Sequence, residues 1–364
     1  MSLSAYIHIP FCKRKCSYCA FYSAQAGESK KDEYVSALVN QIMSSKDAGE
    51  KLKSVFLGGG TPSVLFPSHL TRILDALEVV FDVSDAEVTT ELNPESVQNL
   101  FDCRLIKRFT RFSMGVQSFD DEELSLLGRL HGSNQAKEAF SALRNFGAEN
   151  INIDLMLALP GKNHLQKLEN TLDIAVSLSP EHISAYILTP EKGTSLFENY
   201  GQNNDDLSSE AYLMACEKLE KAGYEHYEIS NFAKKGKRCV HNMCYWTQQK
   251  YLAFGPSACG FDGNRRYRID CSTDEYVKNN GIVAPLLEEE LNGTELLSER
   301  IMLSLRLSDG IDGETLNEIR RNKEKERFIE SLVSSSLAKY NERGGISLTD
   351  RGFLVSNSII SRLM

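Results

Sequence analysis

The sequence predicts an α/β fold with parallel strands. Between residue 5 and about residue 190, short apolar segments alternate with amphipathic segments at fairly regular spacing, and Gly, Pro and Asn mark their boundaries. Strands and helices that alternate in this way predict a parallel sheet with right-handed crossovers. Six such units are compatible with a doubly wound sheet or with a barrel-like sheet.

The composition is that of an ordinary globular chain. Hydrophobic residues make up 41% of the 364 residues and charged residues 25%. No apolar run approaches the roughly 18 to 20 residues that span a bilayer, and no signal-peptide pattern precedes the first predicted strand. We therefore expect a cytoplasmic protein. The net charge of −9 argues against a general nucleic-acid binder, because phosphate binding draws on an excess of Lys and Arg.

Strands and helices can be placed along the first half of the chain. In the first helix, Tyr34, Leu38 and Ile42 recur at four-residue spacing, and Ser29 with Asp32 predicts a capping box at its start. The predicted strands are residues 5–9, 53–57, 86–92, 111–116, 150–158 and 182–188. The predicted helices are residues 30–46, 68–81, 96–108, 134–147 and 164–178.

The pattern changes after Gly193. A polar stretch over 201–206 predicts a linker, a helix is expected over about 207–222, and residues 224–270 are rich in Tyr, Phe, Gly and Arg without a clear period. From about residue 295 the chain is helical again, and a turn-and-strand signal at Gly344–Asp350 leads into a last apolar helix. This tail resembles a small α+β winged-helix-like module. We therefore divide the chain into residues 1–200, 201–290 and 291–364.

Unusual residues follow the predicted strands. Because the ligand site of a parallel α/β sheet lies at the carboxyl ends of its strands, these positions are candidates for binding. Their place after successive strands predicts one shared site. They are Pro10–Cys12, Gly58–Pro62, Glu91–Pro94, Gln117 and Asp154.

Three cysteines form the most specific signal in the chain. Cys12, Cys16 and Cys19 lie on one loop directly after a strand, close enough to ligate three corners of a cubane. A 4Fe-4S cluster held by three thiolates has one iron without a protein ligand, and a substrate can chelate that iron. The alternative is a structural zinc site, which would need His8 or a remote residue as its fourth ligand.

A second constellation contains the only Trp of the chain, a His and two cysteines. Cys239, His241 and Cys244 could bind a metal with Cys259 as the fourth ligand. His241 could instead be an axial ligand of haem, with the neighbouring aromatic rings packed against the porphyrin. The third alternative is a packed loop with an ordinary buried histidine. The remaining cysteines, Cys103, Cys216 and Cys271, are interpreted as plain buried thiols.

The cysteine loop resembles the radical S-adenosylmethionine superfamily, in particular its branch of oxygen-independent coproporphyrinogen oxidases and their HemW relatives. The resemblance covers nearly the whole chain. It implies a partial barrel of six strand–helix units, in which S-adenosylmethionine chelates the open iron and is split by an electron from the cluster into methionine and a 5′-deoxyadenosyl radical. The matching motif is Tyr6-x-His8-Ile9-Pro10-Phe11-Cys12-x3-Cys16-x-Tyr18-Cys19.

The same resemblance implies an S-adenosylmethionine pocket. Charged and amide groups suit a ligand that carries an ammonium, a carboxylate, a ribose and a sulfonium. Glycines suit close approach of ligand atoms to the backbone. The positions that match the pocket are Tyr6, Gly59, Gly60, Thr61, Glu91, Gln117, Arg129 and Asp154.

Within the superfamily, the second constellation favours the HemW haem chaperones. His241-Asn242-x-x-Tyr245-Trp246 resembles the sequence that marks this group, in which the His is implicated in holding haem. The resemblance then implies a chaperone with haem as cargo, haem-accepting respiratory or cytochrome proteins at the membrane surface as recipients, and an electron donor. It leaves open a homodimer and cleavage of S-adenosylmethionine in the functional cycle.

The alternative function is that of an oxygen-independent coproporphyrinogen III dehydrogenase, and a radical enzyme of another substrate is a third. The dehydrogenases carry a further cysteine two residues after the third cysteine, where this chain has Phe21. They also carry a longer segment before the cysteine loop. Both differences favour the chaperone.

Overall fold

Six parallel strands form the centre of the fold. The computed structural model describes residues 3–202 and 204–364. All six strands predicted from the apolar segments are confirmed, with ends that differ by one or two residues. They are β1 (Leu3–Ile9), β2 (Leu52–Gly59), β3 (Glu87–Leu92), β4 (Arg111–Gln117), β5 (Ile151–Leu157) and β6 (His182–Ile187).

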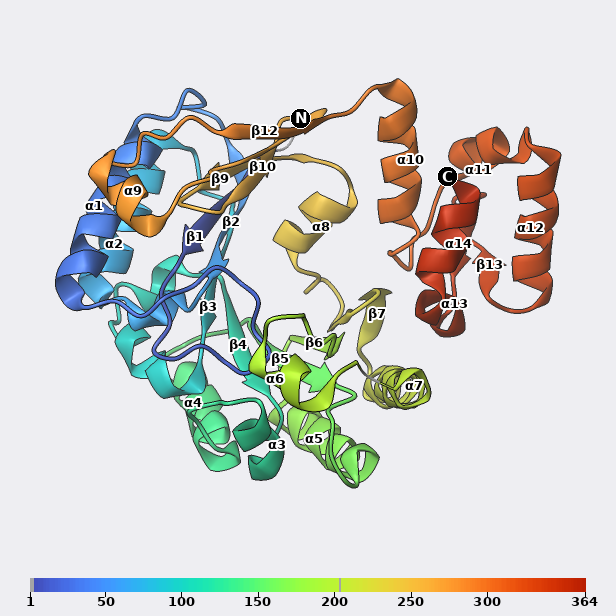
Figure 1. Ribbon diagram of the computed structural model, residues 1–364, viewed down its shortest axis with the longest axis horizontal. Helices are drawn as coiled ribbons and strands as arrows, with labels where there is room; N and C mark the ends of the chain where they lie inside the picture. Colours follow the sequence, from blue (N-terminus) through green and yellow to red (C-terminus); the bar gives the residue numbers. More distant parts are fainter. Residues whose placement is uncertain (1–2, 203) are drawn as a thin grey trace.

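The order of these strands decides between the two predicted sheet types. Each of β1 to β6 pairs in parallel with the next strand in sequence, so the order is β1-β2-β3-β4-β5-β6. A doubly wound sheet would reverse direction at a switch point. The order without reversal is that of the barrel-like alternative, and Figure 1 shows the strands following a curve with the helices outside it.

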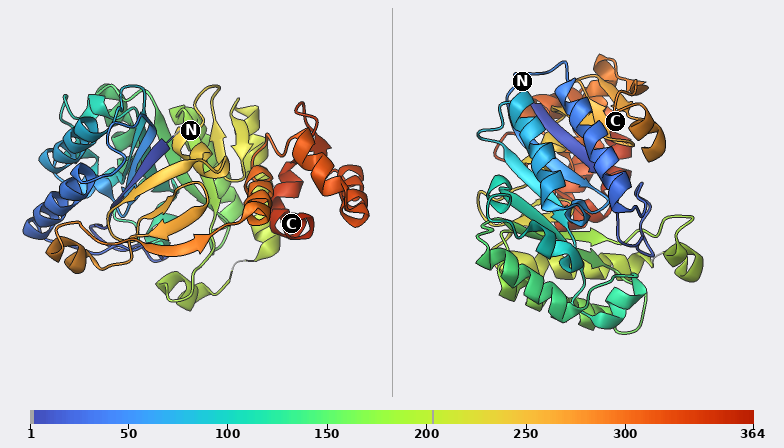
Figure 2. Two further views of the ribbon diagram at one scale, coloured as in Figure 1. Left: turned by 90° about the horizontal axis from the view of Figure 1, so that it is seen from above. Right: turned by 90° about the vertical axis from the view of Figure 1, so that its left-hand side faces the viewer.

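Helices cover the outer face of this sheet (Figures 1 and 2). Their apolar faces and the strands share one core, in which Ile7, Leu38 and Leu57 are fully buried. Four predicted helices are confirmed by α1 (Glu28–Met43), α2 (Pro67–Val80), α4 (Ser133–Asn145) and α5 (His164–Leu178). Two shorter elements, η1 (Pro62–Val64) and α3 (Asp121–Leu126), follow β2 and β4.

Two local predictions are wrong. The helix expected at 96–108 is replaced by two 3₁₀ segments, η2 (Pro94–Leu100) and η3 (Ile106–Arg108). The Asp102 carboxylate accepts hydrogen bonds from the backbone N–H groups of Arg104 and Leu105, and this local bonding competes with a continuous helix. The capping box also fails, because α1 begins two residues earlier than predicted, at Glu28 after Gly27, without a side-chain cap.

Residues 224–270, which show no clear period in the sequence, extend both edges of the sheet. The antiparallel strands β8 (Asn231–Ala233) and β7 (Glu225–Glu228) continue beyond β6, and β9 (Lys250–Phe254) pairs in parallel with β1. The complete twelve-stranded order is β12-β11-β10-β9-β1-β2-β3-β4-β5-β6-β8-β7. The other elements of this part are α6 (Ser195–Tyr200), α7 (Asp205–Lys221), α8 (Val240–Trp246), β10 (Cys259–Phe261), β11 (Arg265–Arg268), α9 (Thr273–Lys278) and β12 (Leu286–Glu290).

The predicted linker at 201–206 is shorter than expected. Residue 203 lies outside the described residues, and Asp205 already belongs to α7. Asn204 caps this helix by accepting hydrogen bonds from the backbone N–H groups of Asp206 and Leu207. The polar residues that indicated a linker are therefore partly the start of a helix.

The C-terminal elements gather beside the sheet, on the right in Figure 1. The Nδ1 atom of His226 on β7 lies 2.9 Å from the Asp350 carboxylate of this part. The observed elements follow the predicted order of helices, turn, strand and last helix, and the winged-helix-like assignment stays a prediction. They are α10 (Gly293–Ser304), α11 (Gly313–Arg320), α12 (Lys323–Ser334), β13 (Ala338–Tyr340), β14 (Ile346–Leu348), α13 (Asp350–Leu354) and α14 (Ser356–Leu363).

Among the described helices, none has the length and apolar character needed to span a membrane.

One buried tyrosine supports the end of β1, where the cysteine loop begins. The Tyr34 hydroxyl donates a hydrogen bond of 2.5 Å to the carbonyl oxygen of His8. Its ring meets that of Phe11 edge-on, with 5.1 Å between the centroids. Helix α1 thereby holds the last residues of β1 in place.

We expect Tyr34→Phe to lower the free energy of unfolding by about 1–2 kcal/mol, because it leaves a buried carbonyl with less hydrogen bonding. Urea unfolding followed by circular dichroism measures the change. Tyr200→Phe is the control, since Tyr200 is 52% exposed. Equal unfolding midpoints for the two variants would contradict this role of Tyr34.

Candidate cofactor-binding site

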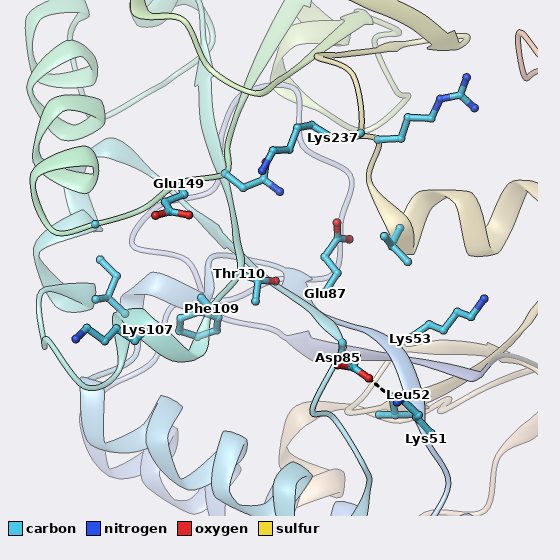
Figure 3. A pocket seen from close by; sticks show the side chains of 17 residues that line it. Lys51, Leu52, Lys53, Asp85, Glu87, Lys107, Phe109, Thr110, Glu149 and Lys237 are labelled. Atoms are coloured by element: carbon cyan, nitrogen blue, oxygen red, sulfur yellow. Dashed lines mark hydrogen bonds and ion pairs between the residues drawn. The ribbon is translucent and has the colours of Figure 1, made fainter.

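Two cavities lie at opposite ends of the strands. One, of about 540 Å³, lies at their carboxyl ends and is lined by the cysteine loop and by residues from β2 to β6. The other, of about 780 Å³, lies at their amino ends, and Figure 3 shows Lys51, Glu87, Lys107 and Lys237 around it. The larger cavity contains none of the predicted cluster or S-adenosylmethionine residues, so the smaller one is the candidate site.

The three loop cysteines line this cavity together. Cys12, Cys16 and Cys19 are each partly buried and lie between β1 and α1. Backbone hydrogen bonds hold the loop at two points, from Cys12 to the Ala24 carbonyl (3.1 Å) and from Ser17 to the Leu127 carbonyl (3.0 Å). The loop therefore presents three thiols to one space.

A chain of hydrogen bonds ties the cysteines to the strand ends. The Arg129 guanidinium donates to the Cys16 sulfur (3.4 Å), to the Asn93 side chain (2.6 Å) and to the Gly115 carbonyl (2.5 Å). The Asn93 amide donates to the Thr61 hydroxyl (3.1 Å), which lies 3.5 Å from the Cys12 sulfur. Arg129 and Thr61, two of the predicted pocket residues, thus position the loop.

His8 is engaged elsewhere and does not complete a zinc site. Its Nδ1 atom lies 3.1 Å from the Tyr6 hydroxyl, and its Nε2 atom lies 3.1 Å from the Tyr22 carbonyl oxygen. Burial lowers the pKa of the imidazole. Since both ring nitrogens are hydrogen-bonded, His8 does not serve as the fourth ligand of the zinc alternative, which then depends on a remote residue.

The glycine turn after β2 lines the cavity, but its glycines are required by the protein backbone. Gly59 has φ of +105°, and a Cβ atom on Gly60 would lie 2.6 Å from the carbonyl oxygens of Ile9 and Phe11. The turn packs against the start of the cysteine loop, to which Gly60 and Thr61 donate backbone hydrogen bonds. Close approach of chain to chain therefore accounts for Gly60, and the close approach of a ligand to these glycines stays a prediction.

Two buried carboxyl groups, those of Glu91 and Asp154, line the cavity. Burial and the nearby charge of Asp154 raise the pKa of Glu91 to about 8, although the Gly59 N–H donates to its carboxylate (3.0 Å). Burial also raises the pKa of Asp154, which accepts hydrogen bonds from Asn152 (2.7 Å) and Ser113 (3.3 Å). A ligand with hydroxyl or cationic groups would stabilise the ionised form of both carboxyl groups.

Further polar atoms in the cavity have no partner among the described residues. They include Gln117 Oε1 and Arg129 Nε. Gln117 ends β4 with φ of +73°, a backbone conformation that is uncommon outside glycine and is often found at binding sites. Of the predicted S-adenosylmethionine residues, only Tyr6 does not line the cavity; it stacks on Phe56, which does.

These residues fit the implied cofactors. Three thiols on one loop, without a fourth ligand from His8, suit a cluster with one open iron. The unpartnered Gln117 oxygen and the carboxyl groups of Glu91 and Asp154 suit the hydroxyl, ammonium and sulfonium groups of S-adenosylmethionine.

The predicted haem residues do not form an open surface in this conformation. His241 is 1% exposed, with Nδ1 2.8 Å from the Ser54 hydroxyl and Nε2 2.8 Å from the Tyr245 hydroxyl. Burial and the positive charge of Arg111 lower its pKa to about 3, so the imidazole is neutral. Both nitrogens are engaged, and Trp246 is partly buried on the same helix, whereas Asn242 lines the cavity. Ligation of iron by His241 would require one of these bonds to break.

The second-metal alternative is not assembled. The Cys239 sulfur lies 3.6 Å from the Glu87 carboxylate, whereas the Cys244 sulfur faces the backbone carbonyl of Lys250 at 3.6 Å. Within the described part of the chain, the side chains that converge closely enough for a single ion are Cys216, His226 and Asp350. The interpretation of Cys103 as a buried thiol is also wrong, because it is exposed.

Three cavity residues were missed as site residues by sequence reasoning. Asn93 and Tyr18 belong to quoted motifs but received no role, although Asn93 links Arg129 to Thr61 and Tyr18 lies beside Arg129. Arg111 was not considered, because an arginine at the start of a strand usually faces solvent. Only the structure shows that all seven residues of β4, Arg111 included, are buried.

Comparison with known proteins defines the class. Residues 6–175 match the model of the Radical SAM superfamily. The structure resembles that of the coproporphyrinogen III oxidase HemN from Escherichia coli, with a TM-score of 0.79 and 22% identity over 100% of this chain and 90% of that chain. The latter likeness concerns the fold. Fold and family match together make this a Radical SAM protein.

Curated relatives define the family more closely. The Heme chaperone HemW of Bacillus subtilis is 32% identical over 99% of each chain. That of Escherichia coli is 38% identical over 72% of this chain and 70% of the relative. The chain belongs to the HemW family. The mitochondrial Radical S-adenosyl methionine domain-containing protein 1 of Danio rerio is also similar, at 31% identity over 85% of this chain and 73% of the relative.

We expect the ligand-free protein to become less stable as the pH rises from about 5 to 8. The folded state keeps the Glu91 proton up to about pH 8, whereas the unfolded chain loses it near the ordinary value of 4.5. The folded state therefore binds more protons in this window, and the free energy of unfolding falls by at most about 1.4 kcal/mol per pH unit.

Glu91→Gln should flatten this dependence, because an amide does not ionise. Urea unfolding between pH 5 and 9 measures it, with Glu138→Gln on the exposed surface of α4 as control. A Glu91→Gln profile as steep as that of the wild type would show that Glu91 is not the group responsible.

Proposed function

We propose that this protein is a haem chaperone, which binds a 4Fe-4S cluster and S-adenosylmethionine and delivers haem to respiratory-chain proteins. The observation that carries the proposal is the 32% identity to the Heme chaperone HemW of Bacillus subtilis over 99% of both chains. A likeness over the whole length includes the residues after the cysteine site. It therefore covers the His241 segment as well as the part shared with other Radical SAM proteins.

In this proposal Cys12, Cys16 and Cys19 hold the cluster. When bound, the cluster supplies the electron that can cleave the sulfonium of S-adenosylmethionine. Arg129 acts through its hydrogen bond to the Cys16 sulfur, which orients that side chain, and through its bonds to Asn93 and Gly115, which keep the loop against the strands.

The other cavity residues bind and orient S-adenosylmethionine. Glu91 and Asp154 accept hydrogen bonds from its hydroxyl or ammonium groups, and the proton held by Glu91 is released when a cation binds beside it. Gln117 offers its unpartnered side-chain oxygen from the end of β4. The glycine turn of Gly59 and Gly60 brings backbone groups to the same wall.

Haem is the proposed cargo, with His241 as its ligand after a local opening of α8. The Tyr245 hydroxyl, 2.8 Å from Nε2, is the group that iron would displace. His241 is already neutral, as metal ligation requires. The proposed partners are haem-accepting respiratory or cytochrome proteins and an electron donor.

Coproporphyrinogen dehydrogenase activity is the second candidate, because the fold resembles that of HemN. Phe21 argues against it. At the place where the dehydrogenases carry a further cysteine, this side chain has no metal-binding atom and is 69% exposed at the rim of the cavity. Anaerobic assay of the reconstituted protein with coproporphyrinogen III and S-adenosylmethionine tests this candidate, and formation of protoporphyrinogen would favour it over the chaperone.

Cys16→Ser should abolish the iron–sulfur absorbance after anaerobic reconstitution with iron and sulfide, because two thiolates do not retain the cluster. Iron and sulfide content are measured together with the spectrum. Cys103→Ser, which changes an exposed cysteine outside the cavity, is the matched control and should reconstitute like the wild type. Full iron content in Cys16→Ser would refute the cluster assignment.

Two variants of α8 test the haem ligand in opposite directions. His241→Ala should weaken haem binding by at least about tenfold, or about 1.4 kcal/mol. Tyr245→Phe should strengthen it, because the phenyl ring cannot hydrogen-bond to Nε2 and the opening becomes easier. Absorbance titration with haem measures both affinities. Unchanged affinity in both variants would place the haem ligand elsewhere.

A further inference from the structure

Arg111 is a buried cation inside the cavity. It is the first residue of β4, its exposed fraction is 2%, and it is among the largest fully buried side chains of the protein. It contributes to the lining of the cavity that contains the three cysteines. The guanidinium is therefore shielded from bulk solvent but open to a ligand within the cavity.

This guanidinium lacks a direct partner. It forms no ion pair or hydrogen bond with the residues that the structure describes, and its Nε atom is buried without a hydrogen-bond partner. Glu87 and Asp154 act on it electrostatically without direct contact. Burial of a charged group without a close partner is unfavourable, so a buried arginine is normally paired.

The carboxyl groups that act on Arg111 do not bind it directly. Glu87 contacts the Cys239 sulfur (3.6 Å) and the His241 backbone N–H (3.2 Å), and Asp154 is buried with a raised pKa. The guanidinium therefore keeps hydrogen-bonding capacity for a ligand.

Arg111 lies on the floor of the cavity, away from the cysteine loop. Gln117 ends the same strand six residues later, so at about 3.3 Å per residue the two Cα atoms lie roughly 20 Å apart. Helix α8 contributes to both cavities, with Val240 in the one at the amino ends and Asn242 in the one that contains the cysteines, and Arg111 lines the second cavity and not the first. A group bound by Arg111 would enter from the cysteine side.

We propose that Arg111 is an anchoring residue that binds a carboxylate of the ligand in this cavity. A guanidinium binds a carboxylate through two parallel hydrogen bonds, which would pair the buried charge and satisfy Nε or the terminal nitrogens. The inference rests on the proposed function for its two sources of carboxylate, a haem propionate and the methionyl group of S-adenosylmethionine.

Binding measurements with paired probes distinguish these sources. The reconstituted wild type and Arg111→Gln are titrated with haem and haem dimethyl ester, and with S-adenosylmethionine and 5′-methylthioadenosine, which lacks the amino-acid group. Arg111→Gln should weaken binding of one carboxylate ligand at least tenfold and leave its carboxylate-free counterpart unchanged. If haem loses affinity and its dimethyl ester does not, Arg111 binds a propionate. If S-adenosylmethionine loses affinity and 5′-methylthioadenosine does not, Arg111 binds the methionyl carboxylate.

Two further variants separate anchoring from a structural role. Arg111→Lys keeps the charge but not the two-point geometry and should lose a smaller part of the affinity. Arg144→Gln, at an arginine paired with Glu181 outside the cavity, should leave all four affinities unchanged. The melting temperature of ligand-free Arg111→Gln should not fall, because the side chain has no close partner to lose.

The inference is overturned if Arg111→Gln binds all four probes like the wild type, or if acid and ester lose affinity equally while the melting temperature falls. Wild-type protein that does not bind haem at all would refute the proposed function, and the S-adenosylmethionine pair would still decide the role of Arg111.

Discussion

The unbroken parallel pairing of β1 to β6 is the constraint on which the rest of the structure depends. Because each strand runs in the same direction beside its predecessor, six carboxyl ends meet at one rim. The cysteine loop, the glycine turn, Glu91, Gln117 and Asp154 lie far apart in the chain and meet there. Had the order reversed, as in a doubly wound sheet, the same residues would have been divided between two sides of a switch point.

Arg129 converts this shared rim into a defined site. Its guanidinium joins the Cys16 sulfur to Asn93 and to the backbone of β4, and Asn93 continues the chain to Thr61 and the Cys12 sulfur. A loop with three thiols needs such support, because isolated loops lose considerable conformational entropy when ordered. The same arginine places a positive charge beside the Cys16 sulfur.

Helix α8 connects the predicted haem residues with the cavity. His241 packs between Phe56 of β2 and Tyr245 with both nitrogens bonded, while Asn242 reaches the cavity. Its neutral imidazole therefore lies close to the predicted S-adenosylmethionine residues. If His241 holds haem, α8 must open. Because Arg111 acts on the His241 imidazole and also lines the cavity, this opening would depend on what the cavity binds.

By itself the sequence determined the six strands, five of the helices (α1, α2, α4, α5 and α7) and the three-cysteine loop, because periodicity, turn residues and ligand spacing are local properties. It also indicated the pocket positions from Gly59 to Asp154 through family motifs. Only the tertiary structure decided the strand order, the 3₁₀ segments in place of a helix at 96–108, the burial of His241 and the unpaired charge of Arg111. These depend on contacts between residues distant in the chain. Gly60 illustrates the difference: the sequence predicted a glycine that a ligand approaches, and only the structure shows that the carbonyl oxygens of Ile9 and Phe11 leave no room for a side chain there.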